Sequence, residues 1–457
     1  MRRETSRVRR TKGFPMVETP RESWPSASQE ASETLDVARE TASRLPVRLS
    51  FLLAITGGVI VFYLCFAGIG GLLIPSQIAA IDPTHKVADL GVIATVTALA
   101  AFIVGPISGA LSDRTTTRFG RRRPWIFGGT VGSALALALL IRADSILLLG
   151  LGVMLYQAFA NVALEALNAL VPDLVPERQR GTASGLIGLG LPIGSIAAAI
   201  LVGGLTKIPQ TAYLVMLIIT LIFLFSFSLL VHERPIDRET VPPFRLTEFF
   251  KGFWINPRQH PDFAWAFAVR FIPILGFYVG NAYLFYYLQD AVQYQRVFPG
   301  QTALQGAAII TAVETGALTL SILLGGVLSD RFQRRKPFVI ISVTFLAVGL
   351  LLYGFVQVWT VVLIACVILG LAMGSYLAVD LALTTLVLPT AEAHGKDLGI
   401  MGIAFTLPGS FAPGISGFIL LAFQGAGPHT SYAVLFTLAA FLTLVGIPAV
   451  LQIKGVR

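Results

Sequence analysis

The chain has 457 residues, of which 55% are hydrophobic and only 13% are charged, and its formal net charge at pH 7 is +9. A soluble domain cannot bury so much apolar surface, so the composition excludes a soluble globular protein and indicates a polytopic membrane protein. The sequence has two cysteines and contains no CxxC, HExxH, P-loop or GxSxG motif. We therefore expect no disulfide framework, no metal, no cofactor and no enzymatic activity.

Residues 1–48 differ from the rest of the chain. They mix both charge signs with Ser, Thr and Pro and have little apolar periodicity, which predicts a disordered cytoplasmic tail. The first apolar run begins only near Leu49, so the tail is not a cleavable signal peptide. Its basic cluster would contact anionic lipid headgroups, or would simply be solvated. That cluster consists of Arg2, Arg3, Arg7, Arg9, Arg10 and Lys12.

Twelve apolar stretches follow, each near the roughly 20 residues that a membrane-spanning helix needs. They run at about 49–75, 90–111, 125–141, 145–170, 181–204, 211–231, 262–288, 303–328, 338–356, 359–388, 398–422 and 430–453. The predicted fold is an all-α membrane protein with twelve transmembrane helices in two pseudo-symmetric six-helix bundles. The bundles cover residues 49–231 and 262–457, the second ending in a short tail. A cytoplasmic linker over 232–261 joins them and contains an interfacial segment, "FRLTEFFKGFWINP".

The basic residues are distributed unevenly between the two ends of these spans. Of 34 Lys and Arg residues, only Lys86, Arg142, Lys207 and Arg296 lie near loops that follow an odd-numbered span. The positive-inside rule then predicts that both termini lie in the cytoplasm. We expect the protein to reside in the plasma membrane. Because topology explains the positive charge, nucleic acid is not expected as a partner.

A repeated motif relates the two halves of the chain. Residues 109–114, "GALSDR", match residues 326–331, "GVLSDR", at an offset of 217, and Pro172 matches Pro389 at the same offset. Each motif precedes a basic run that ends in proline, "RRRP" or "RRKP". The chain is therefore a duplication of six spans in parallel orientation.

The two GxLSDR…RR(R/K)P loops resemble the cytoplasmic signature of the major facilitator superfamily, and the match covers essentially the whole chain after residue 48. The first loop, "RTTTRFGRRRPW", is similar to the glycoside–pentoside–hexuronide:cation symporters and to the sucrose:proton symporters. This resemblance implies alternating access, in which two halves rock about a central site that faces one side of the membrane at a time.

The loops themselves are candidates for a cytoplasmic gate. Their aspartates would accept charge-assisted hydrogen bonds from arginines or from the N-terminus of a facing helix. Alternatively, the basic residues serve topology alone. The candidate gate residues are Asp113, Arg114, Arg121 and Arg122 in the first loop, and Asp330, Arg331 and Arg334 in the second.

Polar side chains inside the spans mark the candidate transport site, because a charge near mid-bilayer costs about 2.5–3.5 kcal/mol or more. In the fourth span, four polar residues spaced four, four and three apart form a stripe along one helix face. They are Gln157, Asn161, Glu165 and Asn168.

Three further charged residues, Arg270, Asp380 and Glu314, lie in spans of the second half. Arg270, Asp380 and Glu165 each lie about 10–14 Å from the cytosolic end of their span at 1.5 Å per residue. The resemblance implies that the spans holding them line one central cavity. We expect Arg270 to pair with Asp380 or with Glu165, leaving one carboxylate to bind and release a proton; the alternative is a purely structural ion pair. Glu314 is another candidate, although it could simply hydrogen-bond Thr311.

The seventh span adds aromatic residues, with Tyr278 and Asn281 one turn apart. Together with the polar stripe of the fourth span and Gln77, they would supply the aromatic platform and the hydroxyl-binding groups of a sugar site. Aromatics near helix ends also form the ordinary interfacial belt, which is the alternative.

Two departures from the similar families refine the expected function. Ala101 and Gly105 stand where the glycoside–pentoside–hexuronide pattern has two sodium-binding carboxylates, so a proton is the expected coupling ion. The fourth span lacks the arginine of the sucrose carriers, so sucrose itself is not expected. The sequence predicts a proton-coupled symporter for a sugar or similar small polar solute, acting as a monomer in the lipid bilayer. An exporter of small amphiphiles and a non-transporting membrane protein remain alternatives.

Overall fold

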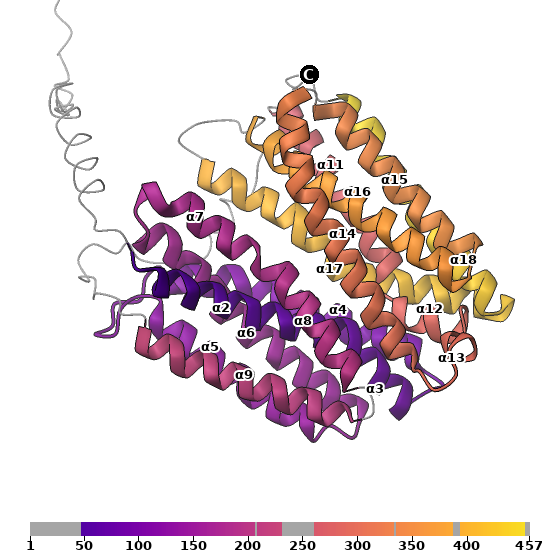
Figure 1. Cartoon of the computed structure of the whole chain (residues 1–457), viewed down its shortest axis with the longest axis horizontal. Coiled ribbons are helices and arrows are strands. Elements are labelled where there is room, and N and C mark those ends of the chain that lie inside the picture. The colour runs from indigo at the N-terminus through magenta and orange to yellow at the C-terminus, as the bar shows by residue number, and fades with distance from the viewer. Residues whose placement is uncertain (1–46, 206–207, 231–259, 333–334, 387–393, 453–457) are drawn as a thin grey trace, which may run out of the picture. The chain divides into compact units, whose positions relative to one another are not determined.

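The computed structural model describes residues 47–205, 208–230, 260–332, 335–386 and 394–452, and every regular element in them is a helix (Figure 1). Twelve of the described helices are long and apolar enough to cross a membrane. The predicted tail and interfacial segment lie outside the described residues.

The first half of the protein contains the first six spans. One span combines α2 (Leu49–Phe66), the π-helix η1 (Ala67–Leu73) and α3 (Ile74–Ile81), and another combines α7 (Glu177–Gly188) with α8 (Gly190–Gly204). The others are α4 (Lys86–Ser112), α5 (Arg123–Ile141), α6 (Ile146–Leu174) and α9 (Pro209–Leu230).

The second half contains the other six spans. The first of them combines α11 (Pro261–Asn281) with α12 (Leu284–Asp290), and the short α13 (Tyr294–Val297) follows. The others are α14 (Ala303–Phe332), α15 (Arg335–Phe355), α16 (Trp359–Leu386), α17 (His394–Ala422) and α18 (Pro428–Gln452), with the 3₁₀ turn η3 (Gln424–Ala426) before α18.

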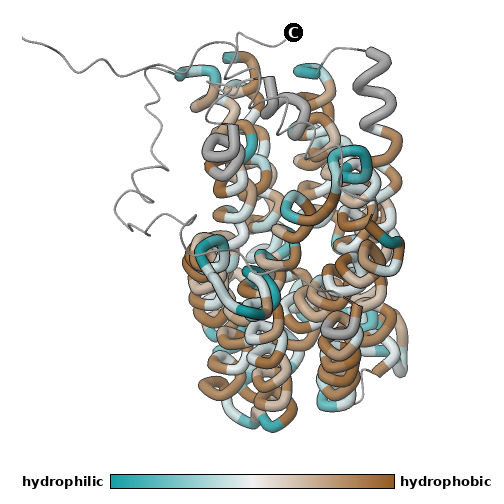
Figure 2. Tube along the Cα trace, turned by 90° about the vertical axis from the view of Figure 1, so that its left-hand side faces the viewer, coloured by the Kyte–Doolittle hydropathy of each residue, from teal (hydrophilic) through white to brown (hydrophobic). Residues whose placement is uncertain are grey.

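The apolar residues run along the bodies of the helices, and polar residues gather at the turns that join them (Figure 2). We call the end of the bundle that holds the turns 113–122 and 175–176 the basic end. The end that holds the turns 82–85, 142–145 and 291–302 is the opposite end.

The turn 82–85 shows how a polar loop ends one span and begins the next. Asp82 Oδ1 accepts hydrogen bonds from the backbone N–H groups of Thr84 and His85, at 3.1 and 3.0 Å. The bond from the His85 N–H lowers the pKa of the Asp82 carboxyl. The contact between the side chains, 3.0 Å long, raises the pKa of the His85 imidazole. This local network fixes the turn that leads into α4.

The two halves pack against each other through two helix pairs, α4 with α17 and α8 with α14. In the first pair the Ser410 hydroxyl donates to the carbonyl oxygen of Ala98, at 3.3 Å. In the second pair Gly203 lies beside Ala308. Both pairs connect helices that are far apart in sequence.

Candidate functional site

Arg122 organises the loop at the basic end. Its Nη1 donates to the Ser112 hydroxyl at 2.6 Å and its Nε donates to Asp173 Oδ2 at 2.9 Å. Arg122 also pairs with Asp113, and Arg121 pairs with Asp173. Since only 6% of the Arg122 side chain is exposed, these bonds replace the hydration of a buried charge. The described contacts therefore tie α4, α5 and α6 of the first half together.

Other predicted gate residues occupy different positions. The Arg114 guanidinium donates from Nη1 to the carbonyl oxygen of Ala110, at 2.8 Å, in the last turns of α4, which precedes it. Asp330 and Arg331 belong to α14, but their side chains lie outside the described residues, as does Arg334. A gate role for the second loop thus stays a prediction.

Arg270 of α11 pairs with Asp380 of α16. Nε and Oδ2 are 3.1 Å apart, and the exposed fractions of the two side chains are 14% and 3%. The guanidinium also lies 5.5 Å from the centroid of the Phe405 ring, a cation–π distance. The Tyr376 hydroxyl lies beside Asp380 and donates to the carbonyl oxygen of Val269 at 2.8 Å. The charges of Arg270 and Asp380 therefore balance each other within the second half.

Glu165 differs from Asp380 in its surroundings. Its side chain is exposed on α6, and none of the hydrogen bonds or ion pairs among the described residues involves its carboxylate. Gly105 of α4 lies against it, so that a Cβ added at that glycine would be 3.9 Å from Glu165 Oε1. Within the part of the chain that the structure describes, Glu165 is thus a carboxylate without a matched cation.

Two neighbouring tyrosines come from different halves, and Tyr63 is the one that lies near this carboxylate. Tyr63 of α2 interacts electrostatically with Glu165 and with Tyr278 of α11. A Cβ added at Gly409 of α17 would be 3.9 Å from the Tyr278 ring. The two rings and the carboxylate therefore form one candidate site between the halves.

The stripe predicted on the fourth span lies along one face of α6. Gln157 and Asn161 are half-buried, and Asn168, like Glu165, is exposed. The Asn161 amide donates to the carbonyl oxygen of Gln157 at 2.7 Å, which fixes its nitrogen against its own helix. The Gln157 side chain therefore stays half-exposed and the Glu165 carboxylate exposed on this face.

Three predicted residues are engaged elsewhere. Gln77 is buried in the first half, where its Oε1 accepts from the Tyr213 hydroxyl at 2.7 Å. The Asn281 amide donates to the carbonyl oxygen of Phe277 at 3.2 Å, and its Oδ1 is buried. Glu314 lies near Tyr353 and Cys366 in the second half. It does not bond Thr311, whose hydroxyl donates to the carbonyl oxygen of Ala307 at 2.9 Å.

Sequence reasoning missed Tyr63 and Asp173. Tyr63 lies in an apolar run of the sequence. In the structure it differs from its buried neighbours because it lies, with Gly57 and Ile60, on a half-exposed face of α2. Asp173 directly follows Pro172 near the end of a span, and a carboxylate at that level, facing the basic loop, was an available signal. The described residues contain no group of three or more His, Cys, Asp or Glu residues that could hold a metal ion.

The family model described as Major Facilitator Superfamily matches residues 55–315 and 299–454 of this chain. Among curated proteins, an uncharacterized symporter of Synechocystis sp. is 39% identical over 83 residues, which are 18% of this chain and 13% of that protein. The human proton-associated sugar transporter A is 49% identical over 45 residues, 10% of this chain and 6% of that protein. The alignments thus span small parts of both relatives.

Solved structures share the fold over nearly the whole length. A mutant of the nucleoside transporter NupG superimposes with a TM-score of 0.71 at 14% identity, covering 88% of this chain and 100% of that one. A D-xylose–proton symporter superimposes with a TM-score of 0.63 at 17% identity, covering 89% and 98%. At these identities the likeness establishes the fold.

Proposed function

This chain belongs to the major facilitator superfamily of transporters, and on that premise we propose that it is a proton-coupled symporter of a sugar or similar small polar solute. It is a transporter rather than an enzyme, with twelve membrane spans. The observation that carries the proposal is the unmatched carboxylate of Glu165 beside Tyr63, which in turn neighbours Tyr278 of the other half.

Glu165 is the proton carrier in this proposal. An unpaired carboxylate inside a span is costly as an anion, so a proton removes the charge whenever the site is withdrawn from water. Asp380 is less suited to this role, because Arg270 already balances its charge. Glu165 would therefore load a proton on one side of the membrane and release it on the other.

The solute would bind between Tyr63 and Tyr278. Aromatic rings cover the apolar face of a sugar ring, while amide and carboxylate groups read its hydroxyls, and Gln157 and Glu165 supply both kinds of group. Because the two tyrosines belong to different halves, a bound solute would contact both and favour their closure around it. The similarity to the human proton-associated sugar transporter A and to the D-xylose–proton symporter supports this substrate class.

In this proposal the basic end faces the cytoplasm, both termini lie on that side, and the protein resides in the plasma membrane. The arginines of the turn 113–122 support this orientation by the positive-inside rule. The halves pack at α4–α17 and α8–α14, while Glu165 and Asn168 are exposed. We assign this arrangement to the stage of the cycle in which the site faces the cytoplasm.

Proton movement in proteoliposomes tests the proposal. Purified protein is reconstituted in vesicles with a pH-sensitive dye outside, and mono- and disaccharides, glycosides and amphiphilic drugs are added in turn. Entry of a sugar together with protons makes the external medium more alkaline. We expect this signal with at least one sugar and its loss in Glu165→Gln.

Glu177→Gln is the matched control, because Glu177 is an exposed glutamate at the start of α7, where its contact with Arg180 is 3.8 Å long. It should transport like the unmodified protein. Sugar-driven proton movement that persists in Glu165→Gln would remove Glu165 from the mechanism. A proton signal with amphiphiles alone would identify an exporter instead.

A further inference from the structure

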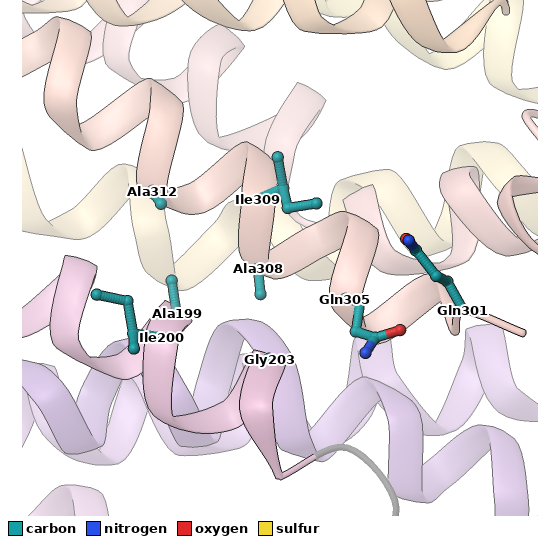
Figure 3. Close-up of a pocket in the computed structure, with 8 residues that line it drawn as sticks. All are labelled: Ala199, Ile200, Gly203, Gln301, Gln305, Ala308, Ile309 and Ala312. Atoms are coloured by element: carbon teal, nitrogen blue, oxygen red, sulfur yellow. The ribbon is translucent and has the colours of Figure 1, made fainter. Parts of the chain in front are cut away.

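A groove of about 330 Å³ lies where α8 and α14 meet (Figure 3). The α8 side is formed by Ala199, Ile200 and Gly203, and the other side by five residues of α14 and the turn before it. Those five are Gln301, Gln305, Ala308, Ile309 and Ala312. The groove therefore has one wall from each half of the transporter.

The apolar part of the groove faces the bilayer. Ile200 is 70% exposed and Ile309 is 40% exposed, although both belong to membrane-spanning helices. Small residues bring the two helices together beside them, since a Cβ added at Gly203 would be 3.1 Å from the Ala308 Cβ. Hydrocarbon chains are the only abundant apolar molecules at such a surface.

The two glutamines lie at one end of the groove and present donors. Gln305 Oε1 accepts from the backbone N–H of Thr302 at 3.0 Å, and Gln301 Oε1 accepts from the Tyr294 hydroxyl at 2.6 Å. Both amide oxygens are thus occupied, whereas no described residue accepts a hydrogen bond from either Nε2 group. The groove consequently offers N–H donors and selects a ligand with acceptor oxygens.

The depth of the glutamines fits a lipid headgroup. Gln305 is the third residue of α14 (Ala303–Phe332), and Gly203 precedes the last residue of α8 (Gly190–Gly204), so this part of the groove lies at the opposite end of the bundle. The partial positive charge of the α14 N-terminus adds to the attraction for an anion. From Gln305 to Ala312 the groove extends about 10 Å toward the middle of the membrane.

We propose that this groove binds a membrane phospholipid. Its phosphate and ester oxygens accept hydrogen bonds from the Gln301 and Gln305 amides, and one acyl chain lies along Ile200, Ala308 and Ile309. Because the lipid contacts both α8 and α14, it stabilises the arrangement in which the halves are packed at the opposite end. The site is independent of the transported solute and would exist whichever solute the protein carries.

Two substitutions isolate the donor groups. Gln301→Glu and Gln305→Glu keep an oxygen that accepts from Tyr294 and Thr302, but they replace each free NH₂ with a carboxylate oxygen that repels a phosphate. Delipidated full-length protein in detergent is titrated with phosphatidylglycerol, and native mass spectrometry counts the bound lipids. We expect the affinity of the double variant to be lower by about tenfold or more, because charge-assisted hydrogen bonds are lost.

Gln424→Glu is the matched control, since Gln424 is an exposed glutamine of η3 at the same end and the change in charge per substitution is the same. It should bind phosphatidylglycerol like the unmodified protein. Diacylglycerol, which lacks the phosphate, should bind weakly and equally to all variants. Equal phosphatidylglycerol affinity in the double variant and the unmodified protein would overturn the proposal. The proposal would also be overturned if inorganic phosphate competed with the lipid at a similar concentration.

Discussion

Arg270 and Asp380 carry opposite charges into the membrane at a separation of 3.1 Å, and both side chains are largely shielded from solvent. At the scale of single residues, such a pair matters most when one member is removed. The remaining charge is then buried without compensation, which typically costs about 3–5 kcal/mol. Removing both members can be nearly neutral, because no charge is left to hydrate.

We therefore predict that Asp380→Asn lowers the thermal stability of the purified protein strongly, by on the order of 3 kcal/mol. The double variant Arg270→Gln/Asp380→Asn should recover most of that loss. Thermal unfolding in detergent, followed for the single variants and the double variant, measures the coupling. If the loss of stability in the double variant equalled the sum of the losses in the two single variants, the two residues would not be coupled.

Residues of the candidate site could be predicted only where their signal is local. The stripe of α6 repeats every three to four positions, and a buried charge such as Arg270 is conspicuous in an apolar span. Tyr63 has no such signal, and Asp173 offers only its place at the end of a span, because the importance of both comes from partners 51 or more positions away, as in the contact of Arg122 with Asp173. Gln77 was predicted as a site residue because Tyr213, the partner that donates to its oxygen, is 136 positions away and cannot be recognised as a partner from the sequence.

At the scale of helices, apolar length was sufficient to predict all twelve spans. The first span, Leu49–Ile81, is longer than the predicted 49–75. The prediction ends at 75 because Pro75, Ser76 and Gln77 interrupt the apolar run. Pro75 instead lies in the first turn of α3, directly after η1, where a proline needs no backbone donor. The π-helix η1 has no signature in hydropathy and could not be predicted from it.

Close helix contacts provide a second prediction. A Cβ at Gly276 of α11 would lie 2.1 Å from the Thr443 Oγ1 and 2.7 Å from the carbonyl oxygen of Ala439 on α18. Gly276→Ala should therefore force α11 and α18 apart and reduce stability by about 1–3 kcal/mol. The measurement is again the thermal unfolding midpoint.

Gly316→Ala is the matched control for this contact. Gly316 also lies inside a helix, α14, but a Cβ there would meet nothing within 4 Å. Since alanine favours the helix by about 0.5–1 kcal/mol over glycine, this variant should be neutral or slightly stabilised. A similar loss of stability in both variants would mean that the contact with α18 does not determine the effect.

At the scale of the whole transporter, the described contacts between the halves include a clamp at the opposite end. Lys86 at the start of α4 donates to Asp290 at 2.7 Å and to Gln289 at 2.9 Å, and its ammonium lies 4.9 Å from the centroid of the Tyr286 ring. The Tyr283 hydroxyl donates to the carbonyl oxygen of Val87 at 2.8 Å. Gating residues were predicted only at the basic end. The pairing of Lys86 with Asp290 could not be predicted, because the two residues are 204 positions apart.

The Tyr283 hydroxyl explains two glycines that face it. A Cβ at Gly91 of α4 would lie 2.9 Å from this oxygen, and one at Gly417 of α17 would lie 2.5 Å from it. Tyr283 thus fits between α4 and α17, in a space that side chains at either position would fill. For the opposite end to open, this ring and the Lys86–Asp290 pair must both separate.

The third prediction concerns that opening. Lys86→Asp places two carboxylates against each other and should shift the protein toward the state open at the opposite end. A partly exposed pair contributes on the order of 1 kcal/mol, which changes a two-state equilibrium about fivefold. The charge exchange Lys86→Asp/Asp290→Lys should restore the original equilibrium.

Double electron–electron resonance between two spin labels measures this shift in the equilibrium between the closed and open states. Labels on Ile81→Cys and Val297→Cys, both exposed at this end, report the distance between the halves, and the native Cys65 and Cys366 are buried. We expect Lys86→Asp to populate longer distances and the charge exchange to reverse the change. Asp82→Asn is the control, because Asp82 bonds Thr84 and His85 of its own turn and should leave the distances unaltered. An unchanged distribution in Lys86→Asp would mean that Tyr283 and the helix contacts, not the ion pair, hold this end closed.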